Sequence, residues 1–295
     1  MQKRLITGAL AVGAAAALAL TGCSDSGATS ATETSKGTVT IGMFNWDEDI
    51  AVTHLWKAVL EEQGYSVDIK TADPGPVFQG LADGDFDTVL DIWLPLTHEN
   101  YLDMYGDDIV ELGAWNTEAR NAIAVNADAP IDSLDELADN AELFNNQLIG
   151  IEAGAGLTRA TEEAVVPGYG LEQMDYVISS TPAMLTELDT AMSKGENIVV
   201  TLWQPHWAFD AYDLKVLEDP QGTLGEAESI YSYGSSTFAD EFPEVAGWLT
   251  DFKMDADQLH SLEAKMFNEY SGDDYAPIVA GWIAENQAYV DGLTK

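Results

Sequence analysis

The sequence predicts an α/β fold made of two lobes with a ligand cleft between them. Strand-like and helix-like segments alternate along most of the 295 residues. The alternation occurs twice, on either side of residues 120–130, and this indicates two βαβ halves joined by a crossing segment. A hydrophobic fraction of 46% supplies enough apolar surface for a buried core, although the formal net charge is −39.

The N-terminal segment predicts export and lipid anchoring. Two cationic residues precede an apolar run over residues 5–20, and small residues stand directly before Cys23, the only cysteine. This pattern predicts a signal peptide over residues 1–22. The small residues before Cys23 resemble the lipobox of bacterial lipoproteins, and this resemblance implies that Cys23 becomes the lipidated first residue of the mature chain. A transmembrane anchor is the alternative, but it needs about 20 apolar residues. Residues 23–37 are almost entirely Ser, Thr, Ala and Gly with a few charged residues, so they are expected to form a flexible tether.

Residues 38–125 are predicted to form the first part of lobe 1. β-branched apolar runs predict buried strands, and apolar residues at helical spacing predict the helices between them. Glycines 64 and 84 end the two helical segments. The predicted strands cover residues 39–44, 66–70 and 88–93, and the predicted helices cover residues 50–60 and 77–81.

Residues 126–215 repeat the pattern and are predicted to form lobe 2. Residues 216–295 are predicted to return to lobe 1 and to end in amphipathic helical segments. In lobe 2, the predicted strands cover residues 148–151, 176–179 and 197–202, and the predicted helices cover 154–164 and 182–192. The amphipathic segments of the return cover residues 238–252, 255–270 and 275–293.

Composition excludes several classes of function. With 51 acidic and 12 cationic side chains, the chain lacks the basic face that binds nucleic acid. A single cysteine excludes a disulfide framework and a cysteine-based zinc cluster. The acids are spread along the chain, which favours a strongly solvated surface over an acidic recognition patch. A metal site remains an alternative, although no two histidines have chelating spacing; they are His54, His98, His206 and His260.

Motifs for catalysis are weak. The chain has no Gly-x-Ser-x-Gly elbow and no Walker loop, and Gly154-Ala155-Gly156 lacks the third glycine of a dinucleotide fingerprint. Those glycines favour a tight strand-to-helix turn, and an anion site at the helix start is the alternative.

Three tryptophans stand at the C-terminal ends of predicted strands. Trp46 and Trp93 belong to the first half and Trp203 to the second. Open α/β sheets bind ligands at this edge, and indole faces hold a quaternary ammonium group by cation–π attraction of about 2 kcal/mol per desolvated contact. The helix that starts near Asp47 offers backbone N–H groups for a carboxylate at the other end of a small zwitterion.

These motifs together resemble the glycine betaine/proline betaine substrate-binding proteins of ABC transporters. The resemblance covers residues 39 to 270. It implies a two-lobed, periplasmic-binding-protein-like (type II) fold, no enzymatic activity, and an ABC permease with its ATPase subunit as partners. The motifs are Asn45-Trp46, Ile50-Ala51-Val52-Thr53, Leu55-Trp56-Lys57, Asp91-Ile92-Trp93-Leu94-Pro95, Thr97-His98, Gly154-Ala155-Gly156, Val199-Val200-Thr201, Trp203-Gln204-Pro205-His206-Trp207 and Tyr212-Asp213-Leu214-Lys215.

The resemblance also implies binding roles for particular residues. Trp93 and Trp203 match the ammonium cage, and Trp46 is a further candidate wall. The amides of Asp49 and Ile50 match the carboxylate-binding turn, although the family often has glycine in place of Asp49.

One cage position departs from the family. Met254 stands where related sequences often carry another tryptophan, so Tyr231, Tyr233 or Trp46 is an alternative wall. His260, a few residues later, is a candidate contact for the ligand carboxylate, and a surface histidine is the alternative.

The predicted function is therefore the extracytoplasmic, lipid-anchored binding component of an importer for glycine betaine or a related quaternary ammonium solute. Neither a cofactor nor a metal is expected. A choline- or carnitine-type ligand is an alternative within the class. A secreted glycan hydrolase, with Asp91 and Glu152 as its carboxylates, and a metal-capture lipoprotein are alternatives from other classes.

Overall fold

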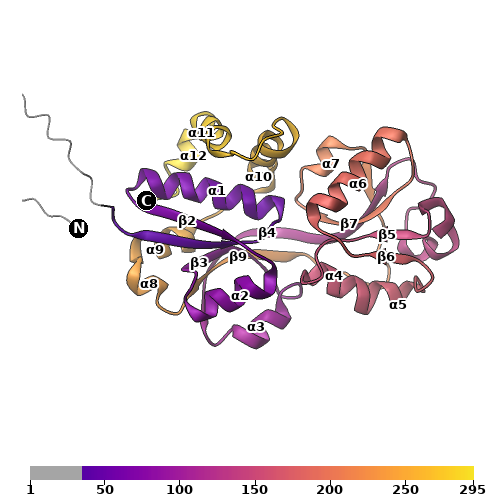
Figure 1. Cartoon of the computed structure of the whole chain (residues 1–295), viewed down its shortest axis with the longest axis horizontal. Coiled ribbons are helices and arrows are strands. Elements are labelled where there is room, and N and C mark those ends of the chain that lie inside the picture. Colours follow the sequence, from indigo (N-terminus) through magenta and orange to yellow (C-terminus); the bar gives the residue numbers. More distant parts are fainter. Residues whose placement is uncertain (1–34) are drawn as a thin grey trace, which may run out of the picture. The chain divides into compact units, whose positions relative to one another are not determined.

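The structure, a computed structural model, describes residues 35–295. The predicted signal peptide, Cys23 and most of the predicted tether lie outside the described residues. Within them, strands and helices alternate in a mixed α/β architecture (Figure 1), and nine strands pair in the order β2-β1-β3-β9-β4-β7-β5-β6, with β8 added to β4.

The first lobe is built on three parallel strands with β1 in the middle. Figure 1 shows α1 on one side of these strands and α2 and α3 on the other. Along the chain, strands and helices alternate from β1 to β3 as the sequence predicted. The elements are β1 (Thr38–Met43), α1 (Asp47–Glu62), β2 (Ser66–Thr71), α2 (Pro74–Asp83), β3 (Thr88–Leu94) and α3 (Glu99–Tyr105).

Helix α1 forms because its apolar residues recur at helical spacing. Leu55, Trp56, Val59 and Leu60 are all buried against the sheet and the C-terminal helices. Each such side chain contributes about 2 kcal/mol on burial. The helix ends before Gly64, whose φ of +91° is a backbone conformation that favours glycine.

Two strands absent from the sequence-based prediction join the halves of the sheet. β4 (Ile109–Asn126) pairs antiparallel with β9 (Glu228–Ser235) through its first part and with β7 (Val199–Gln204) through its last part. β9 also pairs antiparallel with β3. The crossing strand therefore starts well before residue 120, and the sheet is mixed. Register shifts interrupt the β4–β9 ladder, as expected of a strand that passes from one lobe to the other.

The second lobe has three parallel strands, with β5 between β6 and β7. The predicted helix over residues 154–164 is a short α-helix followed by a π-helical turn. Two short 3₁₀ helices precede β5. The elements not yet given are η1 (Leu134–Glu136), η2 (Ala138–Phe144), β5 (Gln147–Ile149), α4 (Gly156–Ala160), η3 (Thr161–Val165), α5 (Val166–Tyr169), β6 (Asp175–Val177), α6 (Thr181–Lys194), α7 (Ala208–Ala211) and β8 (Leu214–Val216).

The chain stays with the second lobe for several residues after β8. The Leu217 N–H donates to the Ile123 carbonyl oxygen at 2.9 Å, and the Leu134 N–H donates to the Glu218 carbonyl oxygen at 3.0 Å. The next strand, β9, returns to the first lobe. The boundary between residues 215 and 216 stays a prediction, and these bonds favour a later return.

The C-terminal helices cover α1. α10 and α11 both pack against it, and Trp282 of α11 is fully buried there. The three predicted amphipathic segments correspond to three groups of helices. These are α8 (Phe238–Glu241) with α9 (Pro243–Asp251), α10 (Ala256–Glu263) with the π-helical turn η4 (Ala264–Asn268), and α11 (Ala276–Glu285) with α12 (Gln287–Val290).

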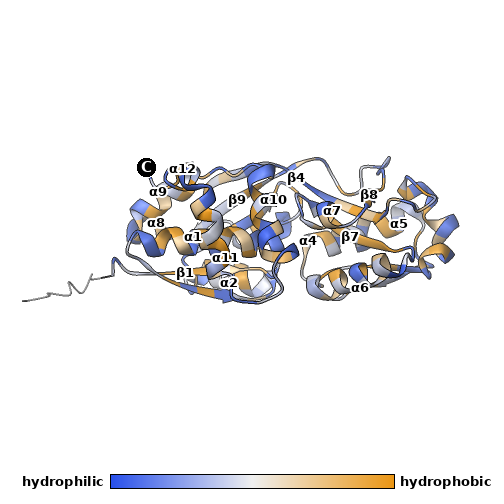
Figure 2. Cartoon of the chain, turned by 90° about the horizontal axis from the view of Figure 1, so that it is seen from above, coloured by the Kyte–Doolittle hydropathy of each residue, from blue (hydrophilic) through white to orange (hydrophobic). Residues whose placement is uncertain are grey.

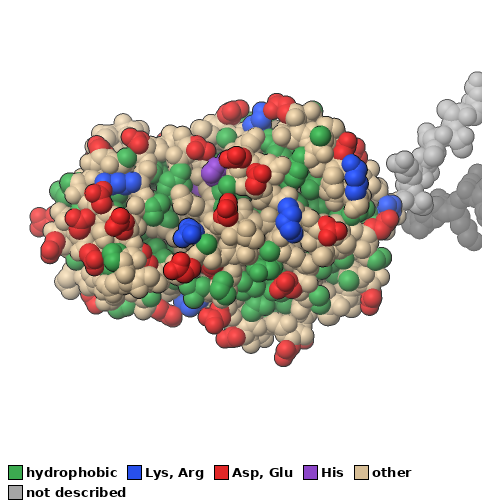
Figure 3. Space-filling model, turned by 180° about the vertical axis from the view of Figure 1, so that it is seen from behind, with side chains coloured by type: hydrophobic (Ala, Val, Ile, Leu, Met, Phe, Trp, Pro, Cys, Tyr) green, Lys and Arg blue, Asp and Glu red, His purple; other side chains and the backbone are tan. Residues whose placement is uncertain are grey.

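The surface is acidic, and the apolar residues lie inside. Figure 2 shows apolar residues along β1 and β7, with hydrophilic residues distributed over the helices around them. On the face seen in Figure 3, acidic side chains are scattered and outnumber the basic ones. Across residues 35–295, no helix combines the length and the apolar character that crossing a membrane requires.

Candidate functional site

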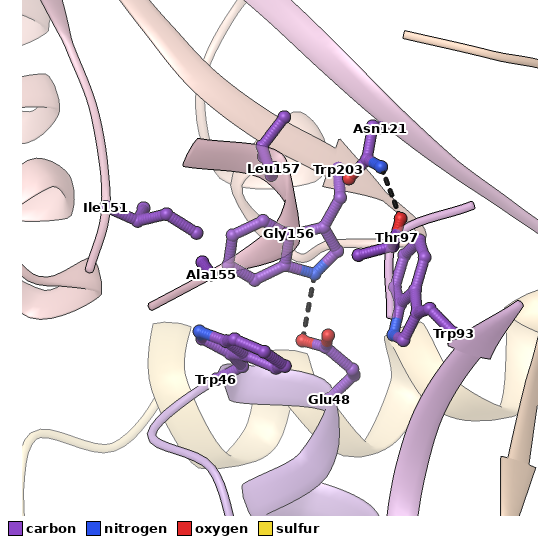
Figure 4. A pocket seen from close by; sticks show the side chains of 10 residues that line it. All are labelled: Trp46, Glu48, Trp93, Thr97, Asn121, Ile151, Ala155, Gly156, Leu157 and Trp203. Carbon is purple, nitrogen blue, oxygen red and sulfur yellow. Dashed lines mark hydrogen bonds between the residues drawn. The ribbon is translucent and has the colours of Figure 1, made fainter. Parts of the chain in front are cut away.

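The three tryptophans predicted from the sequence line one cavity. Trp46 directly precedes α1, Trp93 lies near the end of β3, and Trp203 lies near the end of β7. All three are at most 5% exposed. The cavity has about 280 Å³ of empty space, which includes space open to solvent, and Figure 4 shows Trp203 above Trp46 with Trp93 at one side. The lining residues are Trp46, Glu48, Trp93, Thr97, Asn121, Ile151, Ala155, Gly156, Leu157 and Trp203.

Carboxylates hold the indole rings in place. The Trp203 Nε1–H donates to Glu48 at 2.8 Å, and the Trp46 Nε1–H donates to Glu152 at 3.3 Å. Each of these bonds joins one lobe to the other. Within the first lobe, the Trp93 Nε1–H donates to Asp91 at 2.9 Å. Because the ring edges are engaged in this way, the ring orientations are set before a ligand meets the faces.

Trp207 extends this pattern beside the cavity. Its Nε1–H donates to Asp47 at 2.5 Å, which is a third bond between an indole of one lobe and an acid of the other. His206 Nε2 lies 3.5 Å from the same Asp47 oxygen. A fourth tryptophan therefore helps to hold the lobes together.

Two neutral histidines support the rings from behind. The His98 ring stacks on Trp46 with centroids 5.6 Å apart, and its Nδ1 accepts the Trp93 backbone N–H at 2.9 Å. The His206 ring lies edge-on to Trp203 at 4.7 Å. Burial lowers the pKa of both histidines to about 3, so both are neutral at physiological pH. Within residues 35–295, no group of three or more His, Cys, Asp or Glu side chains is arranged to hold a metal ion.

The two lobes meet closely at the start of α4. A Cβ placed on Gly156 would lie 1.9 Å from the Thr97 carbonyl oxygen, so only glycine allows this approach. Beside it, the Tyr101 hydroxyl donates to the Gly154 carbonyl oxygen at 2.9 Å, and the Arg159 guanidinium donates to the Leu96 carbonyl oxygen at 3.2 Å. Gly154-Ala155-Gly156 is thus a turn that permits contact between the lobes.

Several buried acids lie at and near the start of α1, where Glu48 lines the cavity. Asp47, Glu48 and Asp49 form the first turn of α1, and each is at most 7% exposed. Burial raises the pKa of Asp47 to about 6 and that of Asp49 to about 7. Burial, followed by repulsion from Asp91 and Glu263, holds the pKa of Glu48 well above its usual range. Burial, followed by repulsion from Asp49, raises the pKa of Asp91, and burial, followed by repulsion from Asp47, raises the pKa of Glu263.

The predicted carboxylate-binding turn is already engaged in bonds within the protein. The Ile50 N–H donates to the Trp46 carbonyl oxygen at 2.9 Å. The Asp49 side chain accepts the Phe44 N–H at 2.6 Å and the Thr53 hydroxyl at 2.9 Å. Asp49 and Ile50 are both buried and lie outside the cavity lining. Their assignment as ligand contacts stays a prediction.

The other candidate residues are outside the cavity lining. His260 is on α10, with its Nδ1 3.7 Å from a carboxylate oxygen of Asp210. Met254 is buried, and its N–H donates to the Trp115 carbonyl oxygen. The Tyr233 hydroxyl donates to Glu111 at 3.2 Å. The cavity lining contains none of the four candidates His260, Met254, Tyr231 and Tyr233.

Three polar lining residues were missing from the sequence-based prediction. Glu48 is two positions after Trp46, and this spacing was the one signal available for it. Thr97 and Asn121 bond to each other at 2.7 Å, as Figure 4 shows. Asn121 lies on β4, the crossing strand that the sequence pattern did not predict.

Two α/β lobes that meet around an aromatic cavity define the class of two-lobed substrate-binding proteins. The model of the family "Substrate binding domain of ABC-type glycine betaine transport system" matches residues 37–285. The chain therefore belongs to this family, as the motifs in the sequence predicted.

Individual relatives agree with the family match. The glycine betaine/carnitine transport binding protein GbuC of Listeria monocytogenes is 33% identical over 173 residues, which are 57% of this chain and 55% of that protein. The chain thus spans about half the length of that curated relative.

Structural alignments with solved structures cover nearly the whole described chain. Lactococcal OpuAC, in its closed form with glycine betaine, has a TM-score of 0.81 at 30% identity, covering 88% of this chain and 100% of that one. The glycine betaine/L-proline-binding protein ProX of Borrelia burgdorferi has a TM-score of 0.82 at 30% identity, covering 88% and 97%.

Proposed function

We propose that this protein is the extracytoplasmic binding component of an ABC importer and captures a quaternary ammonium compound between Trp46, Trp93 and Trp203. It passes the ligand to a membrane permease that is driven by an ATPase subunit. Cys23 carries the lipid that holds the protein at the membrane, and residues 23–37 tether the binding domain to it. The protein has no enzymatic role.

The observation that carries this proposal is the convergence of three indoles from two lobes on one small cavity. A methylated ammonium group has no N–H to donate, so hydrogen-bond acceptors alone hold it poorly. Indole faces attract it, by about 2 kcal/mol for each desolvated contact. Glu48, the acidic residue of the lining, places its carboxyl group beside the rings.

The hydrogen bonds of the candidate carboxylates argue against the hydrolase alternative. Both carboxylates already accept hydrogen bonds within the protein. Asp91 accepts the Trp93 indole N–H, and Glu152 accepts the Trp46 indole N–H together with the Thr181 backbone N–H. Both act as supports for the aromatic walls.

A zwitterionic ligand would need partners for its carboxylate as well. The amides at the start of α1, near Asp49 and Ile50, are the candidates that the family resemblance implies, and the imidazole of His260 is a further candidate. Because Ile50 already donates to Trp46, a zwitterion would depend mainly on the N–H groups of residues 47–49, which have no partner within the helix.

A thermal-shift screen tests the proposed function directly. Binding stabilises the folded state by mass action, by about 2.7 kcal/mol when the ligand is at 100 times its Kd. Glycine betaine, choline, carnitine, ectoine and proline form the panel, with glucose as the control. We expect a rise in melting temperature with at least one quaternary ammonium compound. The absence of a shift with all of them, confirmed by calorimetry, contradicts the proposal.

A further inference from the structure

A buried acid outside the cavity lining holds the loop that follows β3. Glu228 is the first residue of β9 and is 3% exposed. Its Oε2 accepts the Leu96 N–H at 2.7 Å and the Thr97 N–H at 2.9 Å, and its Oε1 accepts the Thr97 hydroxyl. One carboxylate therefore binds three donors of two successive residues, and Thr97 itself lines the cavity.

These bonds fix the peptide between Leu96 and Thr97. A trans peptide is planar, and its N–H and C=O groups point in opposite directions. Because Glu228 holds the Thr97 N–H, the Leu96 carbonyl points away from it, and that oxygen accepts the Arg159 guanidinium of the second lobe at 3.2 Å. The next carbonyl, of Thr97, is the one that lies against Gly156. Glu228 thus orients the part of the loop that meets the second lobe.

The same carboxylate sets the direction of a hydrogen-bond chain that ends in the cavity. A carboxylate only accepts, so the Thr97 hydroxyl donates its proton to Glu228 and its oxygen is left to accept. The Asn121 amide N–H donates to that oxygen at 2.7 Å (Figure 4), and the same nitrogen lies 3.4 Å from Glu228 Oε1. The Asn121 nitrogen is therefore engaged by the loop, and its oxygen is the atom left to accept a further bond.

Glu228 lies where the chain crosses between the lobes. It pairs with Ala119 in the ladder between β4 and β9. β4 passes from one lobe to the other and carries Asn121, and β9 is the strand on which the chain returns to the first lobe. The loop after β3 is thereby attached, through one side chain, to both strands that join the halves of the sheet.

We propose that Glu228 is a positioning residue of the binding site, which holds the loop after β3 and orients Asn121 before a ligand arrives. This inference rests on the proposed function, because it describes what keeps that same site in order. Glu228 is not part of the cavity lining and acts through Thr97 and Asn121, which are. The conformational cost of ordering these groups is then met during folding, so it does not reduce the affinity.

Glu228→Gln tests the direction of the chain with little change of shape. Glutamine presents one oxygen and one NH₂ group in place of two oxygens. Its oxygen is expected to keep the two backbone N–H groups, so its NH₂ group faces the Thr97 hydroxyl and the Asn121 amide. Because two NH₂ groups cannot bond to each other, the Asn121 amide is expected to turn over. If a tenth of the molecules keep the wild-type orientation, Kd rises about tenfold.

The measurement is isothermal titration calorimetry with choline and with glycine betaine, for whichever of them binds the wild type. Asp87→Asn is the matched control. Asp87 also accepts a backbone N–H within the first lobe, from Thr40 at 2.6 Å, and it lies outside the cavity lining. This control should lower the melting temperature and leave Kd unchanged, whereas Glu228→Gln should change both.

Hydrogen exchange of the Asn121 side chain reports its orientation separately. In the wild type, the bond to Thr97 protects the amide hydrogens. In Glu228→Gln the amide is expected to face the cavity, so its ¹⁵N-labelled NH₂ group should exchange with water faster in the ligand-free protein. A role of Glu228 in stability alone would not change this local signal.

A second pair of variants keeps the test decisive if Glu228→Gln does not fold. Thr97→Val removes the hydroxyl that links Asn121 to Glu228, and Thr97→Ser keeps it. The valine variant should bind about fivefold or more weakly than the serine variant. Equal affinities of these two variants overturn the inference.

The remaining outcomes separate this inference from the proposed function. A Kd of Glu228→Gln within about threefold of wild type, an equal loss in Asp87→Asn, or unchanged exchange of the Asn121 amide overturns the positioning role alone. If the wild-type protein binds no quaternary ammonium compound of the thermal-shift panel, the proposed function fails, and the positioning role fails with it.

Discussion

Replacement of Trp203 measures how much one cage wall contributes to binding. This indole is 3% exposed, lines the cavity and donates to Glu48 across the lobes. Trp203→Ala removes one cation–π contact of about 2 kcal/mol and leaves the ligand incompletely desolvated. A total loss of about 2–4 kcal/mol corresponds to an affinity about 30 to 700 times weaker.

Trp203→Phe separates the ring face from the indole N–H. The variant keeps an aromatic wall, although phenylalanine attracts cations less than tryptophan, and it deletes the 2.8 Å bond to Glu48. A loss of about 1–2 kcal/mol is expected, which is roughly 5- to 30-fold in affinity. This intermediate effect would show that both the face and the edge of the ring contribute.

Trp282→Phe is the matched control. Trp282 is fully buried, and its Nε1–H donates to the Ser261 hydroxyl at 3.0 Å, but it lies outside the cavity lining. The substitution should lower the melting temperature and leave Kd unchanged. Calorimetric titration with choline and glycine betaine, after circular dichroism has verified folding, measures all three variants. Affinities of Trp203→Ala within about threefold of wild type would refute the cage.

Three further outcomes are expected. Gly156→Ala places a methyl group against the Thr97 carbonyl oxygen and should hold the lobes apart. Ligand affinity then falls about tenfold if the closed form drops to a tenth of the population, and X-ray scattering should show that the variant closes only at a higher ligand concentration than the wild type. Burial raises the pKa values of Glu48 and Asp91, so the folded state keeps protons that the unfolded chain has lost. The free energy of unfolding without ligand, measured in urea, should therefore fall as the pH rises from 8 to 9, where the histidines of the unfolded chain are almost fully deprotonated; a rise would contradict this assignment. Cys23→Ala should move the protein from the membrane fraction to the soluble fraction, and retention in the membrane would count against the lipid anchor.

Local sequence patterns predicted the elements whose signal lies within their own segment. The strands at residues 39–44 and 88–93 and the helix that contains Leu55 and Trp56 were predicted because side-chain periodicity is a property of the segment itself. β4 and β9 were missed, because their partners come from distant parts of the chain. Polar residues such as Asn116 also interrupt the alternation within β4.

In the binding site too, the sequence determined some features and only the tertiary structure decided others. The positions of Trp46, Trp93 and Trp203 at strand ends are properties of the sequence, because the ends of parallel strands meet at one edge whatever the loops do. Only the tertiary structure decided which of the 51 acids face the rings. Glu48 has the same chemistry as any exposed glutamate, and its burial beside Trp203 depends on contact between two lobes that are far apart in the chain. Burial, which no local pattern encodes, raises the pKa of this acid and places it as the acceptor for an indole of the other lobe.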